Sequence, residues 1–370
     1  MIALVTIALT LVAPPYFVRL VEQQATSQDV AALQMKAESG DAEAQRLLGE
    51  AFEEGTGVEK SDQSAVEWYR KAALQGDAIA AADLGVMYWT GRGVPQDRAE
   101  AVQWYHRAAK KKNPMALYNL GAASYDGEGA PENVVHAFAW FSLADEAGSA
   151  QGNDALKRME LELKTDKKVE AWAFIGEMYD NGYTLPQDAG EAARWYEKAA
   201  VNGDPVAAMH LALLLAGNRL GAPNYPGMLR WCQAAADQNY APGLYCVGQF
   251  YEAGLAGQKD LGMAAQWYLR AVQLGDAGAA AKLANMYWNG DGVKLDRVTA
   301  YMFALLASSV LDEAKKDIAR FRPAMSAKEV RKAEQKAREF RQKQSVVVMR
   351  KSPPQNGAAS QGQTQKLNPK

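Results

Sequence analysis

Tryptophan recurs along this chain at a fixed interval, and this regularity restricts the possible folds more than any other feature. Six tryptophans share a spacing of 36 residues, with one gap of 55 residues after the third: Trp68, Trp104, Trp140, Trp195, Trp231 and Trp267. A second position keeps the same phase with glycine or alanine: Gly49, Gly85, Gly121, Gly176, Ala212, Gly248 and Ala284. Because such self-similarity indicates stacked repeats, we predict a repeat array rather than one globular core.

Each repeat is predicted to contain two helices joined by a turn. Residues 78–113 show the pattern most clearly, since their apolar or small residues recur at intervals of three and four, as on one face of a helix: Ala81, Leu84, Gly85 and Tyr88. Hydrophobic residues make up 48% of the chain and only 14 residues are proline, which suits helices. The fold class is therefore predicted to be all-α.

The glycines of each repeat have two predicted uses. Glycine within a helix costs about 1 kcal/mol relative to alanine, so its recurrence at the position of Gly85 predicts a close approach by the facing helix, which carries the tryptophan. Between the helices, Gly91 and Gly93 can adopt positive φ and Asp97 can cap the next helix. Short connections such as Gly76-Asp77 predict antiparallel neighbours.

The repeat pattern resembles that of the Sel1-like repeat family, a relative of the tetratricopeptide repeat with a longer turn between its helices. The pattern A-x-x-x-L-G-x-x-Y-x-x-G-x-G-V-x-x-D-x-x-x-A-x-x-W-Y-x-x-A-A-x-x-G-D is matched nearly in full from Ala80 to Ala109. The fifth unit, residues 205–240, departs from it, so we expect an irregular turn with a loose segment at 219–226. The resemblance implies a right-handed superhelical solenoid of helix-turn-helix repeats of about 36 residues, and a non-enzymatic, protein-binding function.

Periodicity and composition together predict a division of the chain into six segments. These are an apolar segment (1–27), a first sub-array of a partial helix and three repeats (28–148), an inserted helix (149–168), a second sub-array of four repeats (169–312), capping helices (313–343) and a disordered tail (344–370). The inserted helix is a possible hinge between the sub-arrays. Net charge is −2, which gives no reason to expect a nucleic-acid partner.

The N-terminal segment is the part of the sequence that indicates the cellular compartment of the protein. Residues 2–18 form an uncharged, mostly apolar run interrupted by Pro14-Pro15, with Arg19 as the first cation. A spanning helix needs about 20 residues and a signal peptide begins with basic residues, so the run fits neither fully. We expect an export signal or membrane anchor, with membrane contact through residues 1–20, and hence a periplasmic or membrane-anchored protein. A buried helix packed on the first repeat, in a cytoplasmic protein, is the alternative.

The two cysteines, Cys232 and Cys246, fall in adjacent helices that are predicted to be antiparallel. A disulfide between them is therefore geometrically possible in an oxidising compartment. Exported relatives in the resembling family carry disulfides at a tighter spacing than the 14 residues found here. The sequence leaves open both a disulfide and two separate buried thiols.

Motifs of catalysis or metal binding are not found in the sequence. The three histidines, His106, His136 and His210, fall in different repeats without the spacing of a zinc site, and no phosphate-binding loop or G-x-S-x-G motif is present. Acidic residues of the first helices, such as Glu50 and Glu177, are interpreted as solvated. We therefore expect neither enzyme activity nor a cofactor or metal.

Aromatic residues that depart from the repeat pattern are the candidate partner-binding residues, because interface hot spots are rich in aromatic side chains. The candidates share only this property: Trp89, Tyr118, Tyr125, Trp172, Tyr245 and Trp288. Trp89, Tyr125 and Trp288 occupy one repeat position, which in other repeats holds residues such as Glu53. Packing between neighbouring repeats is the alternative role for them.

Three functions are compatible with these features. The leading one is a scaffold or adaptor that binds other proteins and is exported or membrane-tethered in a bacterial cell envelope. The alternatives are an envelope protein that binds cell-wall fragments or has enzyme-like activity, and a cytoplasmic signalling adaptor. The identity of the partner and the oligomeric state do not follow from the sequence.

Overall fold

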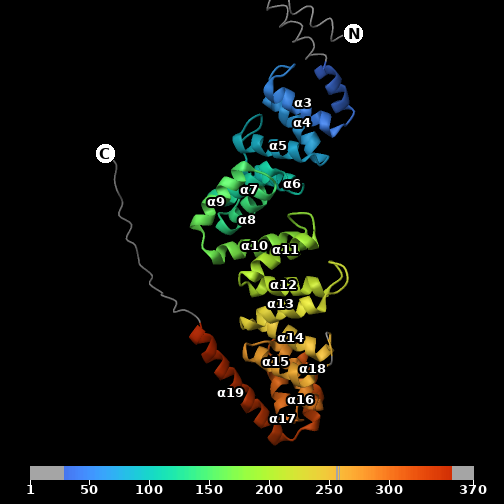
Figure 1. Ribbon diagram of the computed structural model, residues 1–370, viewed down its shortest axis with the longest axis vertical. Helices are drawn as coiled ribbons and strands as arrows, with labels where there is room; N and C mark the ends of the chain where they lie inside the picture. Colours follow the sequence, from blue (N-terminus) through green and yellow to red (C-terminus); the bar gives the residue numbers. More distant parts are fainter. Residues whose placement is uncertain (1–28, 256, 258, 352–370) are drawn as a thin grey trace, which may run out of the picture. The chain divides into compact units, whose positions relative to one another are not determined.

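The computed structural model describes residues 29–255, 257 and 259–351, and in these residues the secondary structure is helical, without a strand. The predicted all-α class of helix-turn-helix repeats is confirmed (Figure 1). The predicted signal or anchor at 1–27 lies outside the described residues. Residues 352–370 of the predicted tail also lie outside them. The described chain opens in a helix that ends at residue 38.

Each of the seven repeats contributes a first and a second helix. The first helices are α3 (Ala42–Glu54), α5 (Ala78–Thr90), α7 (Pro114–Asp126), α10 (Thr165–Asn181), α12 (Pro205–Ala216), α14 (Ala241–Ala253) and α16 (Ala277–Asn289). The second helices are α4 (Asp62–Leu74), α6 (Arg98–Ala109), α8 (Val134–Glu146), α11 (Ala189–Val201), α13 (Tyr225–Asp237), α15 (Leu261–Gln273) and α17 (Arg297–Ala307).

The chain divides into two compact units, and the boundary in the sequence lies between Ala222 and Pro223. Unit 1 contains α3 to α12 and unit 2 contains α13 to α19. The division falls inside the fifth repeat and not at the inserted helix, where the sequence suggested a hinge. The turn after α12 is irregular, as the sequence predicted, because Gly217 is extended (φ −84°, ψ −174°) whereas Gly91 ends α5 in the left-handed conformation (φ 74°).

Helix packing within each unit follows the repeat. In unit 1, α3 packs on α4, α5 on α6 and α7 on α8, and each second helix also contacts the first helix that follows it, as α4 contacts α5. The caps agree with the sequence, since the side chain of Asp77 accepts from the N–H groups of Ile79 and Ala80, and that of Asp97 accepts from Glu100 N–H. These caps fix where the helices begin, and so keep the repeats in register.

The regular spacing of glycine in the repeats is explained by an aromatic ring on the facing helix. A Cβ atom added at Gly85 would lie 2.4 Å from Cε1 of Tyr105, and one at Gly121 would lie 2.5 Å from Cδ1 of Phe141. The predicted close approach of the two helices is confirmed. The ring that requires it belongs to the residue after the repeated tryptophan, not to the tryptophan.

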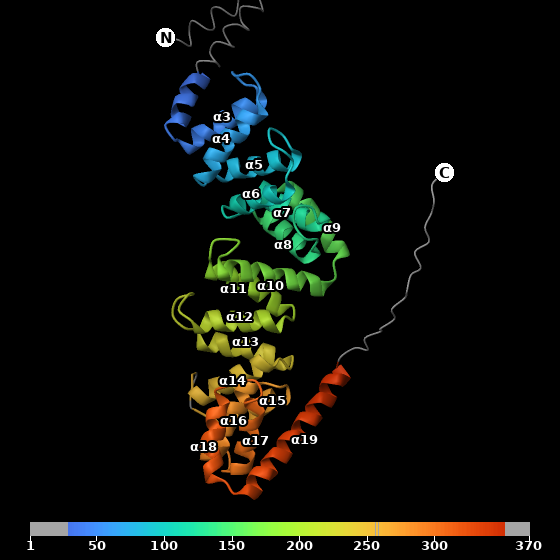
Figure 2. The same ribbon diagram turned by 180° about the vertical axis from the view of Figure 1, so that it is seen from behind.

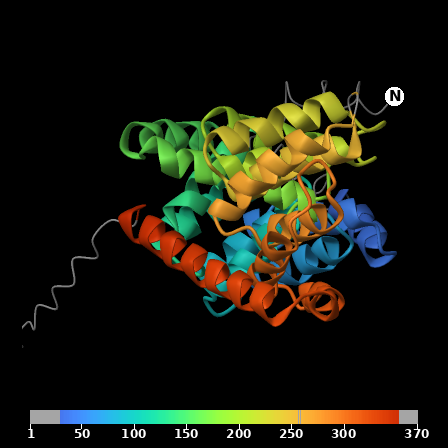
Figure 3. The ribbon, with the colours of Figure 1, turned by 90° about the horizontal axis from the view of Figure 1, so that it is seen from below.

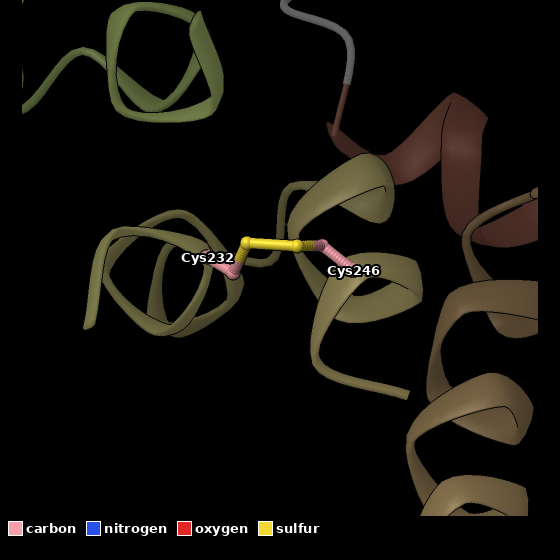
Figure 4. The surroundings of a disulfide bond; sticks show 2 residues. All are labelled: Cys232 and Cys246. Atoms are coloured by element: carbon pink, nitrogen blue, oxygen red, sulfur yellow. A yellow bond between two sulfur atoms is a disulfide. The ribbon is translucent and has the colours of Figure 1, made fainter. Parts of the chain in front are cut away.

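Cys232 and Cys246 form a disulfide that joins α13 to α14 in unit 2 (Figure 4). Their Cα atoms are 5.8 Å apart and both side chains are buried. Cys232 occupies the repeat position that holds Tyr105 in the second repeat, so the disulfide lies where other repeats place an aromatic ring. Of the two possibilities that the sequence left open, the structure shows the disulfide.

The inserted segment forms α9 (Ala150–Glu162), which begins as if it were another first helix. Ser149 caps it by accepting from Gly152 N–H, and α9 contacts α8 as α5 contacts α4. No second helix follows, because the chain passes through Leu163 and Lys164 directly into α10. This helix starts at Thr165, four residues before the expected start of the second sub-array, and it also contacts α8.

The C-terminal helices of unit 2 are α18 (Ala314–Phe321), the short 3₁₀ helix η1 (Arg322–Ala324) and α19 (Ala327–Lys351). A capping box begins α19, since Ser326 N–H donates to Glu329 Oε2 at 2.8 Å and Ser326 Oγ accepts from Glu329 N–H at 3.3 Å. Helix α19 packs on α17, and Figures 2 and 3 show it as the long red helix at the end of the described chain. Its inward residues Val330, Ala333 and Ala337 are buried.

The predicted boundary between the capping helices and the tail is wrong. We expected the tail to begin at residue 344, but α19 continues to Lys351. The physical reason is that the segment from Ala327 to Ser352 contains neither glycine nor proline, and the first helix-breaking residue is Pro353. Polar composition alone placed the boundary too early.

Candidate functional site

The first helices of unit 1 share one side that is not buried against the second helices. In α5 this side is formed by Asp83, Val86 and Trp89, which are three residues apart and therefore lie along one side of the helix. We call these residues, together with their equivalents in the other first helices of unit 1, the first-helix face. The equivalents are Leu47, Glu50 and Glu53 in α3, Asn119, Ala122 and Tyr125 in α7, Phe174, Glu177 and Asp180 in α10, and His210, Leu213 and Ala216 in α12.

Tyrosine hydroxyl groups from the second helices reach this side of the repeats and bind carboxylates there. Tyr69 Oη donates to Glu53 Oε2 at 2.7 Å, and Tyr196 Oη donates to Asp180 Oδ2 at 3.5 Å. Burial is the main cause that raises the pKa of Tyr69, and the hydrogen bond to Glu53 adds to it. The phenol therefore stays protonated and acts as a hydrogen-bond donor at neutral pH.

Two candidate aromatics stand on the first-helix face where other repeats carry the carboxylate. Trp89 in α5 and Tyr125 in α7 occupy the position of Glu53, and α5 and α7 contact each other. Trp89 is half-buried, with its ring centroid 6.4 Å from that of Tyr105, and the Arg98 guanidinium carbon lies 5.4 Å from the centroid of the indole. Tyr125 is 46% exposed. Together they leave aromatic surface open to a partner.

The other four candidates lie elsewhere. Half-buried Tyr118 is one position from the face, with its ring 5.6 Å from that of Phe141. Trp172 takes the position of buried Ala81, and Lys198 Nζ of α11 lies 4.5 Å from its ring centroid.

In unit 2, the ring of Tyr245 lies 5.5 Å from that of Tyr268. The ring of Trp288 is stacked at 4.1 Å on Phe321 of α18, so one side of the indole is already covered. The structure thus places Trp89 and Tyr125 on the first-helix face, on helices α5 and α7 that contact each other. The other four candidates are not part of this face.

Carboxylates dominate the end of the first-helix face formed by α3 and α5. Arg92 Nη1 binds Glu53 Oε1 at 2.8 Å and Arg92 Nη2 binds Asp62 Oδ1 at 2.7 Å, while Arg46 pairs with Glu50. Asp83 is the exception, because no hydrogen bond or ion pair reaches its carboxylate within the described residues. Burial, followed by the charges of Glu53 and Glu50, raises the pKa of Asp83 to about 7.

We expect Asp83→Asn to stabilise the protein at pH 8 and to lose this advantage as the pH falls. In the folded state the carboxylate is ionised only at a cost in free energy. The free energy of unfolding of the wild type therefore declines as the pH rises from the unfolded-state pKa of 3.8 to the folded-state pKa of about 7. The neutral amide avoids this cost, which we expect to be roughly 1–2 kcal/mol. Urea unfolding at pH 8 and pH 4.5 measures it.

A matched control for this prediction is Asp126→Asn, since Asp126 is exposed at the end of α7. Its unfolding midpoint should stay close to that of the wild type at both pH values. An Asp83→Asn variant that is destabilised at pH 8, or whose gain does not depend on pH, would show that Asp83 is ionised without penalty.

A cavity of about 260 Å³ opens between α8, α10 and α12 within unit 1, and the sequence gave no prediction of it. Two stacked ring pairs line it. His136 lies on Phe174 with centroids 4.1 Å apart, and His210 lies on Tyr196 with centroids 5.0 Å apart. One feature of the sequence could have predicted this cavity. The fourth and fifth repeats carry rings, Phe174 and His210, at the repeat position that holds Asp83 in the second repeat.

Metal-binding groups and the third histidine were the remaining features to place within the described residues. No group of three His, Cys, Asp or Glu side chains in this part of the chain could hold a metal ion. His106, the third histidine, lies against Trp140 with centroids 5.6 Å apart, and burial lowers its pKa. Among the helices of residues 29–351 that the structure describes, none is long and apolar enough to span a membrane.

Comparison with known proteins agrees with the repeat geometry. The Sel1 repeat profile matches six segments that together make up more than half of the chain: residues 42–77, 78–113, 114–149, 170–204, 241–276 and 277–309. The chain belongs to the Sel1 repeat family. The unmatched unit at residues 205–240 is the irregular fifth repeat. Sel1 repeats form a non-catalytic fold that generally mediates protein–protein interactions.

The chain is similar to one curated fungal protein and to solved structures of bacterial proteins. Chitin synthase regulator SKT5 from Malassezia restricta is 34% identical over 119 residues, which make up 30% of this chain and only 8% of that relative. A solved Sel1 repeat protein from Oxalobacter formigenes is 25% identical, with a TM-score of 0.40 and coverage of 80% of this chain and 81% of the other. A protective antigen of uropathogenic Escherichia coli strains that displays an SLR fold is 22% identical, with a TM-score of 0.29 and coverage of 90% and 99%.

Proposed function

We propose that this Sel1 repeat protein is a non-enzymatic scaffold that binds a protein partner on the first-helix face of unit 1, and that it is exported or membrane-tethered in a bacterial cell envelope. The family supports the first part, because Sel1 repeats generally mediate protein–protein interactions. A stack of similar helices offers an extended surface that repeat proteins use for binding.

The observation that carries this function is the pair Trp89 and Tyr125. In the first repeat the equivalent residue, Glu53, binds the tyrosine hydroxyl and Arg92, so its polar groups are already satisfied within the chain. In the second and third repeats an aromatic ring replaces the carboxylate on adjacent helices. Partly exposed aromatic rings with little freedom of rotation are the residues that dominate binding energies in protein interfaces.

The proposed compartment is supported by two features of different kinds. The sequence begins with an apolar run at residues 2–18. The Cys232–Cys246 disulfide requires an oxidising environment to persist, as is found outside the cytosol. These features favour export over the cytoplasmic alternative.

Affinity capture from the native cell tests the binding function. The full-length protein should retain a partner that mass spectrometry identifies reproducibly, and Trp89→Ala with Tyr125→Ala should weaken its affinity by at least about tenfold, as expected for hot-spot residues. The control is Tyr183→Ala, because Tyr183 is 83% exposed in the turn after α10 and is not part of the face. Equal retention by the double variant, with unchanged helicity, would remove the face from the proposal.

Cell fractionation tests the compartment separately. The full-length chain should occur in the membrane or periplasmic fraction with both cysteines protected from alkylation. A chain that lacks residues 1–27 should stay in the cytosol with both thiols free. Full-length protein found in the cytosol with free thiols would contradict the proposed export and leave partner binding untouched.

A further inference from the structure

The cavity between α8, α10 and α12 exists because the inserted helix α9 interrupts the repeat. In an uninterrupted array the next first helix would contact α8 where α9 now does. Helix α10 instead contacts α8 at a second place, and His136 near the start of α8 meets Phe174 of α10 in a stack with ring planes 6° apart. The His136–Phe174 pair therefore forms a wall of the cavity that the regular repeat would not produce, whereas the Tyr196–His210 pair comes from the regular contact between α11 and α12.

The chemistry of the cavity is aromatic and anionic. Two carboxylates line it, Glu170 and Glu177, and they lie two helical turns apart on α10 with Phe174 between them. No lysine or arginine is among the described residues that line it. The stacked pair of Tyr196 and His210 forms part of its lining, with ring planes 12° apart.

The two carboxylates differ in what they already bind. Glu170 Oε2 accepts from Lys167 Nζ at 2.7 Å, so its charge is partly compensated at the surface. Glu177 is exposed and forms no hydrogen bond or ion pair with the described residues. A free carboxylate within one helical turn of an aromatic ring has the two elements that recognise a guanidinium, which pairs with carboxylates through its planar N–H groups and stacks on ring faces.

We propose that this cavity binds the guanidinium group of an arginine side chain presented by the protein partner. The proposal rests on the proposed function and extends it, because Phe174, Glu177 and His210 belong to the same first-helix face as Trp89 and Tyr125. Glu177 supplies the charge and the rings supply the stacking surface. Burial lowers the pKa of His136, an effect that outweighs the opposing charge of Glu170. An anionic or neutral side chain would meet an uncompensated carboxylate instead.

Nuclear magnetic resonance of the full-length protein can test this inference without any partner. The probe is the blocked pentapeptide acetyl-Gly-Gly-Arg-Gly-Gly-amide, titrated while the Cε1–H resonances of the histidines are recorded. The chain has 3 histidines. The resonances of His136 and His210 should shift together and saturate as peptide is added. The resonance of His106, which lies against Trp140 outside the cavity, should not shift.

Charge and stacking are separated by the choice of peptide and variant. A pentapeptide with citrulline, the neutral isostere of arginine, should produce no saturable shift, and one with lysine should bind more weakly. Glu177→Gln should weaken binding of the arginine peptide by about two- to fivefold, the upper part of the range expected for loss of one exposed charge pair. Glu162→Gln is the control, since Glu162 is an exposed residue of α9 that does not line the cavity.

Three results would overturn the inference. These are the absence of a saturable shift at His136 and His210, equal shifts with the citrulline peptide, and unchanged affinity in Glu177→Gln. Each of them leaves partner capture through Trp89 and Tyr125 intact. Conversely, a saturable arginine site in a protein that captures no partner would support the cavity and contradict the scaffold.

Discussion

Reduction of the Cys232–Cys246 disulfide should lower the free energy of unfolding by roughly 3 kcal/mol, because the bond closes a short loop and so restricts the unfolded chain. The two cysteines are 14 residues apart and tie α13 to α14. Both side chains are buried, at 0% and 4% exposure, so the thiols would remain in the core and the loss would come chiefly from the broken crosslink. Urea unfolding with and without a phosphine reductant measures the difference.

The control for this experiment is the double substitution Cys232→Ala with Cys246→Ala. Its unfolding midpoint should lie below that of the oxidised wild type and should not respond to the reductant. If the wild-type midpoint is unchanged while alkylation shows that both thiols are free, the disulfide does not stabilise unit 2. The stability of the helix pair would then come from apolar packing alone.

Gly85→Ala should destabilise the protein by roughly 1–3 kcal/mol, the range for overpacking in a core, although the same change stabilises an ordinary helix. An alanine Cβ at this position would lie 2.4 Å from Cε1 and 2.6 Å from Cδ1 of Tyr105. The ring of Tyr105 is only 2% exposed, so it has little room to move aside. Chemical unfolding followed by circular dichroism measures the effect.

The matched substitution is Gly190→Ala in α11. A Cβ at Gly190 would meet only Asp188 Oδ1, at 3.3 Å, so we expect little change or a gain of up to about 1 kcal/mol. A second check removes the ring: Gly85→Ala should cost less in a Tyr105→Cys background, which reproduces the Ala212 and Cys232 combination of the fifth repeat. If Gly85→Ala stabilises the wild type as it would an isolated helix, the close approach does not exist in solution.

Local chemistry in the sequence was sufficient to predict most of the fold. Glycine and aspartate mark the ends and starts of the helices, as Gly76-Asp77 and Asp97 show, because positive φ and side-chain capping act within a few residues. The period of 36 residues then requires stacking, since one pair of helices cannot bury its own apolar face. The irregular fifth turn was also predictable, because Asn218 and Leu220 stand at the repeat positions that hold Gly91 and Gly93 in the second repeat.

The sequence predicted only part of the candidate site. Departures from the repeat identified Trp89 and Tyr125, because equivalent positions of a repeat share one environment and an aromatic ring among carboxylates stands out. The same rule selected Trp172 and Trp288, which the structure places beside Lys198 and Phe321. Repeat position does not reveal which residue a non-repeated element such as α18 will cover.

What the sequence determined is therefore the repeating unit, its helices and turns, and membership of a protein-binding family. The tertiary structure decided how the repeat is interrupted. Helix α9 takes the place of a first helix on α8, α10 packs beside it, and His136 and His210 come to line one cavity although they are 74 residues apart. The repeat period predicts only contacts that recur at equivalent positions of successive repeats. The contacts around the cavity arise where α9 interrupts the repeat, so only the packing of the folded chain could define them.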